Sequence, residues 1–143
     1  MQVNTLQRYG LRTMIEIAMA DDQQSVLQKD ISAKQRISLR YLDHIIRSLK
    51  TAGLIRNKAG RKSGYVLARP ASEITTLDIM NAFQADVKII DCVDPFYDCD
   101  LKESCSTHPF WTDLNDLIKN YLAGTTLESL VLRQKKLENF TKK

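Results

Sequence analysis

The chain has 143 residues, of which 43% are hydrophobic and 27% charged, and its formal net charge is +4. This is the length of one ordinary domain, and the composition is too apolar for a disordered polymer or a collagen. Three cysteines confined to one stretch exclude a disulfide-knotted scaffold. Since no apolar run approaches the ~18 residues of a membrane span and no signal segment is evident, we expect a cytoplasmic protein without a membrane partner.

The charge is distributed unevenly along the chain. Residues 1–70 contain 13 Lys and Arg against 5 Asp and Glu, which gives +8, whereas residues 71–143 contain 8 against 12, which gives -4. A basic side chain that neutralises a phosphate releases counterions, so a basic half of this size favours a polyanionic partner. A solvated basic surface without such a partner is the alternative that charge alone leaves open.

Two helices are predicted at the N-terminus. The first is capped by Asn4 or Thr5, has apolar residues at near-helical spacing and ends at the polar run DDQQ. The second is expected to begin at Ser25, which has capping-box spacing to Gln28, and to stop near Arg36.

A turn around Ile37 leads to a third predicted helix, capped by Ser38 and ended by Gly53. Its apolar face comprises Leu39, Leu42, Ile45, Ile46 and Leu49. Two short strands are expected at residues 54–59 and 65–68, because the intervening GRKSG has the glycines that a hairpin tip needs. This order is that of a helix-turn-helix followed by a basic hairpin.

The second half begins with a predicted helix from Thr75, with Asp78 at capping-box spacing. Residues 86–106 then contain six acids, two lysines and all three cysteines without apolar periodicity, which indicates a surface loop organised by something other than hydrophobic burial, such as a cofactor. A helix from Thr107 to Gly124 follows, and its apolar arc is wide enough to pack on a partner chain as well. Thr125 is expected to open the last helix, which frays into a basic tail.

The helix-turn-helix predicts how DNA would be read, since its second helix enters the major groove. Hydrogen-bonding side chains project from the first turns of that helix: Ser38, Arg40, Tyr41 and Asp43. Arginine suits the guanine edge, whereas aspartate accepts from cytosine and repels phosphates, so we expect Asp43 to discriminate between bases.

Basic residues continue beyond these turns. Arg47 and Lys58 are further candidates for DNA contacts, and Arg61 and Lys62 at the hairpin tip would track phosphates or enter a minor groove. The alternative is that the helices and hairpin build a small core with a solvated charged face. Seven basic residues and one acid between Arg40 and Lys62 favour double-stranded DNA.

A second constellation comprises Cys92, Cys99, Cys105 and His108, separated by six, five and two residues. Thiolates with an imidazole suit zinc or an iron-sulphur centre. The cysteine gaps exceed the roughly two to four residues of paired structural zinc ligands, which favours a larger object. A metal-independent thiol switch and the absence of any site stay open. Since no catalytic constellation is recognisable, we expect neither an enzyme nor a small-molecule substrate.

Several stretches together resemble a known family. They are Arg8-Tyr9, ISLRYLDHIIRSLKTAGLI, the hairpin ending in Gly64-Tyr65, the three cysteines, and CSTHPFWTDLNDLI. The chain is similar in these to the Rrf2 family of winged-helix transcription regulators, and most of all to its iron-sulphur cluster regulators. The resemblance implies a mainly α fold with a small β-hairpin wing, in which a winged helix-turn-helix is joined to a long C-terminal dimerisation helix.

The resemblance also implies a homodimer on a palindromic operator and an iron-sulphur cluster, expected to be 2Fe-2S with 4Fe-4S as the alternative. Its ligands would be three cysteines and a histidine that match Cys92, Cys99, Cys105 and His108. Residues 1–70 would bind DNA, 71–106 would link and carry the cluster loop, and 107–143 would dimerise. A metal-independent thiol switch or a nitric-oxide-responsive regulator of this fold is the alternative.

Three positions depart from the family pattern. Arg8 stands where the family's nitric oxide sensors carry an aspartate, which argues against their arrangement. The first cysteine gap is one residue longer than in the cluster regulators. Ala59 stands where those regulators have a wing arginine, so Arg61 or Lys62 is expected to make its groove contact.

Overall fold

The computed structural model describes residues 2–20, 24–59 and 63–142. Within these ranges the helices are α1 (Thr5–Met19), α2 (Gln28–Gln35), α3 (Leu39–Thr51), α4 (Thr76–Asn81), α5 (Thr107–Gly124) and α6 (Leu127–Thr141). An antiparallel hairpin pairs β1 (Ile55–Asn57) with β2 (Tyr65–Leu67), and three short 3-10 turns are η1 (Ala71–Glu73), η2 (Asp91–Val93) and η3 (Lys102–Ser104). The predicted mainly α fold with a hairpin wing is confirmed. In the part of the chain described here, no helix is long and apolar enough to cross a membrane.

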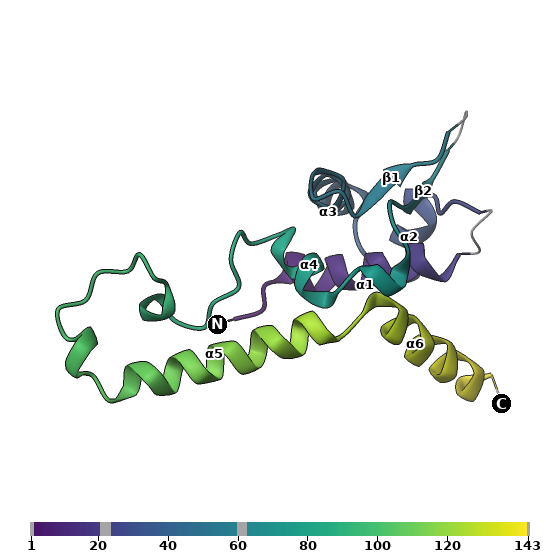
Figure 1. Ribbon diagram of the computed structural model, residues 1–143. Helices are drawn as coiled ribbons and strands as arrows, with labels where there is room; N and C mark the ends of the chain where they lie inside the picture. Colours follow the sequence, from purple (N-terminus) through teal and green to yellow (C-terminus); the bar gives the residue numbers. More distant parts are fainter. Residues whose placement is uncertain (1, 21–23, 60–62, 143) are drawn as a thin grey trace.

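Helices α1 to α4 and the hairpin form one packed group, from which α5 extends as a long rod (Figure 1). The loop between α4 and α5 runs out to the far end of that rod, and α6 continues beyond the other end of the rod and lies next to α1. Helix α1 is central, since it packs against α2, α3, α4, α6 and β2.

The core between α1, α2 and α3 follows the predicted apolar periodicity. Its fully buried side chains include Met14, Ile31, Leu42, Ile45 and Leu49. Leu39 was expected on the same face, but it is exposed because it is the first residue of α3 and the buried face begins one turn later. The amphipathic pattern therefore gives the packing of α3 correctly except at its first residue.

The turn between α2 and α3 has the expected length. Arg36 ends α2 in the left-handed conformation, with φ 55°, and its backbone N–H donates to the carbonyl of Ser32. Ile37 is buried, and the Ser38 hydroxyl then accepts a 3.2 Å hydrogen bond from the backbone N–H of Tyr41. The reversal thus satisfies its own backbone groups and sets the angle between the two helices.

The predicted capping box at Ser25 is wrong. Helix α2 begins at Gln28 without a side-chain cap, because the preceding residues are extended and pair with the wing. Val26 and Tyr65 exchange two backbone hydrogen bonds of 3.1 and 2.8 Å, and the Ser25 hydroxyl accepts from the backbone N–H of Gly64. A Cβ atom at Gly64 would collide with the Val26 carbonyl, so this close approach requires glycine.

A backbone bridge joins the start of α4 to the start of α6. Thr76 N–H donates to the Thr125 carbonyl at 2.9 Å, and Leu127 N–H donates to the Ile74 carbonyl at 2.8 Å. The Thr76 hydroxyl also donates to the Leu122 carbonyl near the end of α5. These contacts fix the point at which α5 leaves the packed group.

The helix ends in this half match the predictions unevenly. The capping box of Thr75 with Asp78 is present, as predicted. Helix α6 is capped by Thr126 and not Thr125, whose carbonyl is held in the bridge. The predicted frayed tail is also wrong, since α6 continues to Thr141.

Candidate DNA interface and cysteine loop

The exposed face of α3 carries most of the residues predicted to read DNA. Ser38, Arg40, Asp43 and Arg47 are all exposed, and the last three recur at spacings of three and four residues. One helical face therefore presents two guanidinium groups on either side of a carboxylate. Asp43 accepts a hydrogen bond from the Gln28 side chain of α2.

Tyr41 differs from these four residues because its ring is half-buried. It packs edge-on against Tyr9 of α1, with ring centroids 5.8 Å apart and planes at 90°. The Arg12 guanidinium lies 5.1 Å from the centroid of Tyr9. The ring of Tyr41 thus helps to attach α3 to α1, and its contact with DNA stays a prediction.

The wing lies beside α3 and supplies further positive charge. Lys58 is half-buried at the end of β1, where its backbone N–H donates to the Gly64 carbonyl at 3.0 Å. Lys50, which follows Arg47 by one turn of α3, places its ammonium 5.2 Å from the centroid of Tyr65. The predicted contacts of Arg61 and Lys62 lie outside the described residues.

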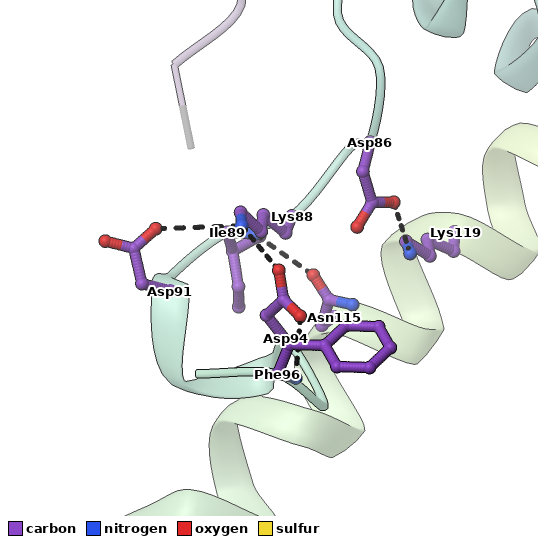
Figure 2. Close-up of polar contacts among 8 residues, drawn as sticks. All are labelled: Asp86, Lys88, Ile89, Asp91, Asp94, Phe96, Asn115 and Lys119. Atoms are coloured by element: carbon purple, nitrogen blue, oxygen red, sulfur yellow. Dashed lines mark hydrogen bonds and ion pairs between the residues drawn. The ribbon is translucent and has the colours of Figure 1, made fainter. Parts of the chain in front are cut away.

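The segment of residues 86–106, called the cysteine loop below, is attached to α5 by polar contacts (Figure 2). The Asn115 side-chain oxygen accepts a 3.0 Å hydrogen bond from the backbone N–H of Ile89, and Asn115 is the one buried residue of α5, at 6% exposure. Lys119, one turn further along α5, forms a 2.9 Å ion pair with Asp86. Sequence reasoning missed Asn115, whose only signal is a polar residue within the wide apolar arc.

Within the loop, Lys88 and Asp94 form a second polar centre. Their charged groups are 2.9 Å apart, and Asp94 also accepts from the backbone N–H of Phe96. This backbone N–H and then the Lys88 ammonium hold the pKa of Asp94 below its usual range. Asp94 in turn raises the pKa of Lys88. The charge pair and the backbone hydrogen bond therefore hold this part of the acid-rich segment together.

The three cysteines lie along this loop with free, half-buried thiols. Cys92 belongs to η2, and its carbonyl oxygen is 3.0 Å from Nε2 of His108. Cys105 lies just before α5, with Sγ 3.1 Å from the Thr107 hydroxyl. The Thr107 hydroxyl, followed by the backbone N–H groups of Thr107 and His108, lowers the pKa of the Cys105 thiol.

The structure brings the predicted ligands to one end of the molecule but does not join them. Among residues 2–20, 24–59 and 63–142, no three His, Cys, Asp or Glu side chains are close enough together to hold a metal ion. His108 reaches the backbone of Cys92 instead of its thiol. Three thiols and an imidazole suit an iron-sulphur centre chemically, so binding one requires a different arrangement of this loop.

The comparisons with known proteins agree with the helix-turn-helix, the wing and the long helix. The family described as "Rrf2: Iron-dependent Transcriptional regulator" matches residues 3–133. The chain belongs to the Rrf2 family. It is 33% identical over 138 residues to the HTH-type transcriptional regulator IscR of Photorhabdus laumondii, a match that covers 96% of this chain and 84% of that protein.

Two solved structures extend the family relationship to the fold. CymR, described as the global cysteine regulator of B. subtilis, matches with a TM-score of 0.76 and 28% identity over 93% of this chain and 98% of that chain. IscR of T. potens matches with a TM-score of 0.74 and 26% identity over 96% and 90%. This Rrf2 protein is therefore a DNA-binding transcriptional regulator with an IscR-like sequence.

The hydrogen bond to Cys105 leads to a test on reduced, metal-free protein. We expect Thr107→Val to raise the pKa of Cys105, because the variant lacks the hydroxyl that stabilises the thiolate. At neutral pH the thiolate fraction then falls, and alkylation of Cys105 by iodoacetamide slows several-fold. Peptide mass spectrometry across a pH series should show the rate profile of Cys105 moving to higher pH.

Thr112→Val is the matched control, since this hydroxyl of α5 donates to the His108 carbonyl and not to a thiol. Cys92 and Cys99 serve as internal references and should keep their profiles. An unchanged Cys105 profile, or an equal shift of all three cysteines, would contradict the assignment.

Proposed function

We propose that this protein is a cytoplasmic regulator that binds a palindromic operator as a homodimer and reports iron-sulphur or redox status through a cluster on Cys92, Cys99, Cys105 and His108. The observation that carries the proposal is the attachment of the cysteine loop to α5, which is itself joined by a backbone bridge to the group containing α3. A change in the loop thus has a continuous structural route to the reading helix.

The proposed base readout uses the exposed face of α3. Arg40 would donate to a guanine edge, Asp43 would accept from cytosine, and Ser38 would reach a base or a phosphate, and all three residues are exposed. Arg47, Lys58, Arg61 and Lys62 would supply phosphate contacts that fix orientation without reading sequence. Entry of Arg61 or Lys62 into a minor groove is the alternative role for these two residues.

The proposed dimer rests on the apolar face of α5. Phe110, Leu117 and Tyr121 are 58%, 66% and 65% exposed, and they lie seven and four residues apart along the helix. Large apolar side chains in such a row are normally covered in a soluble protein. A second copy of α5 would cover them, and a two-fold dimer matches a palindromic operator.

The proposed sensing step depends on the loop residues. A bound cluster would supply one-electron redox chemistry, and the cysteine thiolates of the loop would ligate it. Cys105 suits ligation because its lowered pKa favours the thiolate, and His108 would exchange its contact with the Cys92 carbonyl for ligation. Since this exchange moves the start of α5, ligand occupancy would bias the orientation of the helix and so the operator affinity.

A metal-independent thiol switch is the second candidate. It is favoured by the free thiols, which do not converge on a metal group among the described residues, and by the similarity to the cysteine regulator CymR. A two-electron oxidant such as a peroxide would take up two electrons and two protons from two of the thiols, which would pair as a disulfide in place of cluster ligation. The two candidates differ in their response to iron chelation.

For DNA binding, we expect Arg40→Ala to cost ~1 to 3 kcal/mol of discrimination at one operator position, because a bidentate guanine contact is lost. Lys62→Ala should weaken every sequence similarly and reduce the salt slope by about one. Competition binding with a panel of operator variants at several salt concentrations measures both effects. Equal, sequence-independent losses for the two variants would contradict the role of Arg40.

For the cluster, protein purified and reconstituted without oxygen should be coloured and contain iron and sulphide. Cys92→Ala and His108→Ala should each change the cluster content, measured by absorption spectroscopy and by iron and sulphide counts. His44→Ala is the matched control, because this second histidine lies on α3. Colourless protein with stoichiometric zinc excludes the cluster, whereas disulfide formation with a DNA response unaffected by iron chelation supports the thiol switch.

For the dimer, Leu117→Glu should raise the dissociation constant at least tenfold, roughly the effect of 1.4 kcal/mol, because it places a charge in the apolar interface. Sedimentation equilibrium measures this shift. Leu101→Glu is the matched control, since Leu101 is 67% exposed in the cysteine loop and lies outside α5. The same association state for both variants and the unaltered chain would show that α5 does not form the interface.

A further inference from the structure

Gln28, the first residue of α2, connects the reading helix to the wing through its side-chain amide. Its Nε2 group donates to the carboxylate of Asp43 and, at 3.3 Å, to the backbone carbonyl of Leu39. Its Oε1 atom accepts from the Tyr65 hydroxyl at 3.3 Å. One amide thus contacts α3 twice and β2 once.

The chemistry of these neighbours allows only one orientation of the amide. A backbone carbonyl and an ionised carboxylate can only accept hydrogen bonds, so the NH₂ end of Gln28 must face α3. Both of its hydrogens are used there, by Leu39 and Asp43. The carbonyl end consequently faces Tyr65, whose hydroxyl must donate.

The wing end of this chain of contacts is itself held in place. The backbone of Tyr65 pairs with Val26 on one side and with Asn57 of β1 on the other. The Lys50 ammonium lies 5.2 Å from the centroid of the Tyr65 ring. The Asp43 carboxylate is therefore linked, through two side-chain hydrogen bonds, to a strand paired on both sides.

An exposed aspartate near the start of a helix otherwise samples several rotamers. In DNA binding this rotamer freedom would weaken base selection. The carboxylate repels phosphates in every rotamer, but it can accept a hydrogen bond from cytosine in only one of them. The Gln28 amide restrains one carboxylate oxygen and leaves the other as acceptor. It also compensates part of the negative charge that faces the DNA.

We propose that Gln28 is a positioning residue for base selection, which holds the Asp43 carboxylate in the direction required to accept from one base. Gln28 acts through Asp43 and does not itself read a base. This inference rests on the proposed base readout by α3. Tyr65 contributes to the same positioning, because its hydroxyl donates to the Gln28 amide and keeps the amide in place.

The test is a double-mutant cycle on operator binding. Gln28→Met keeps the length of the side chain and removes both donors. At the operator position where Asp43→Ala abolishes base preference, Gln28→Met should reduce that preference about 3- to 10-fold, which is the range of a typical net hydrogen-bond contribution. In the Asp43→Ala background it should change nothing further. Tyr65→Phe should reduce the same preference by a smaller factor.

Gln134→Met is the matched control, because the Gln134 amide also donates to a carboxylate, that of Glu138, but lies on α6. It should leave base preference unchanged, and thermal melting verifies that each variant is folded. An additional loss from Gln28→Met in the Asp43→Ala background would overturn the proposal by showing that Gln28 acts independently of Asp43. Unaltered preference in Gln28→Met would also overturn it.

If Asp43→Ala alters preference at no position, the role of Gln28 fails together with that of Asp43. DNA reading by α3 is judged separately, by the Arg40→Ala variant and the salt dependence of binding. Failure of the positioning role of Gln28 and failure of the proposed DNA reading by α3 therefore give different experimental results.

Discussion

Two backbone hydrogen bonds determine where α5 leaves the packed group formed by α1 to α4 and the hairpin. They pair the segment before α4 with the segment before α6, and they lie beside Ile74 and Leu127, both of which are completely buried. An unmade hydrogen bond at a buried backbone group costs about 1 to 3 kcal/mol, so the bridge resists opening. Helix α5 leaves the packed group at this point, and the position of the cysteine loop follows from its direction.

Beyond the bridge, the character of the packing changes. The group around α1 is closed by aliphatic side chains, whereas the cysteine loop is held by Asn115, by Lys119 with Asp86 and by the charge pairs of Lys88. Apart from buried Asn115, these groups lie near solvent, where polar contacts contribute little net stability because water competes for the same groups. The loop can therefore exchange one set of contacts for another at lower cost than the group around α1, which is what the proposed sensing role requires.

The sequence predicts the local features of this fold well. Apolar periodicity places the buried face of α3, and short-range capping patterns identify the starts of α1 and α4, where Asn4 pairs with Gln7 and Thr75 with Asp78. Such signals suffice because both partners lie within one helical turn. They fail at Ser25, whose hydroxyl is bonded to the backbone of Gly64, 39 residues away.

In the candidate sites, too, the sequence predicts local features but not contacts between distant segments. Periodicity places Arg40 and Asp43 on an exposed face, yet it carries no sign that Gln28 and Tyr65 restrain Asp43, since that network joins three separate elements. The cysteine spacing identifies a set of donors with suitable chemistry. The spacing does not predict the path of the loop, because that path depends on where Asn115 and Lys119 hold the loop against α5.

The length of helix α5 determines how far a movement at one end changes its direction. Its 18 residues span about 27 Å at the usual rise per residue, with Cys105 and His108 towards one end and the bridge at the other. A rod of this length acts as a lever, so moving its cysteine end sideways by about 3 Å tilts it by roughly 6°. In a two-fold dimer each half tilts in the opposite sense, and the relative angle changes by twice that amount. Two recognition helices that must enter successive major grooves about 34 Å apart tolerate little such misalignment.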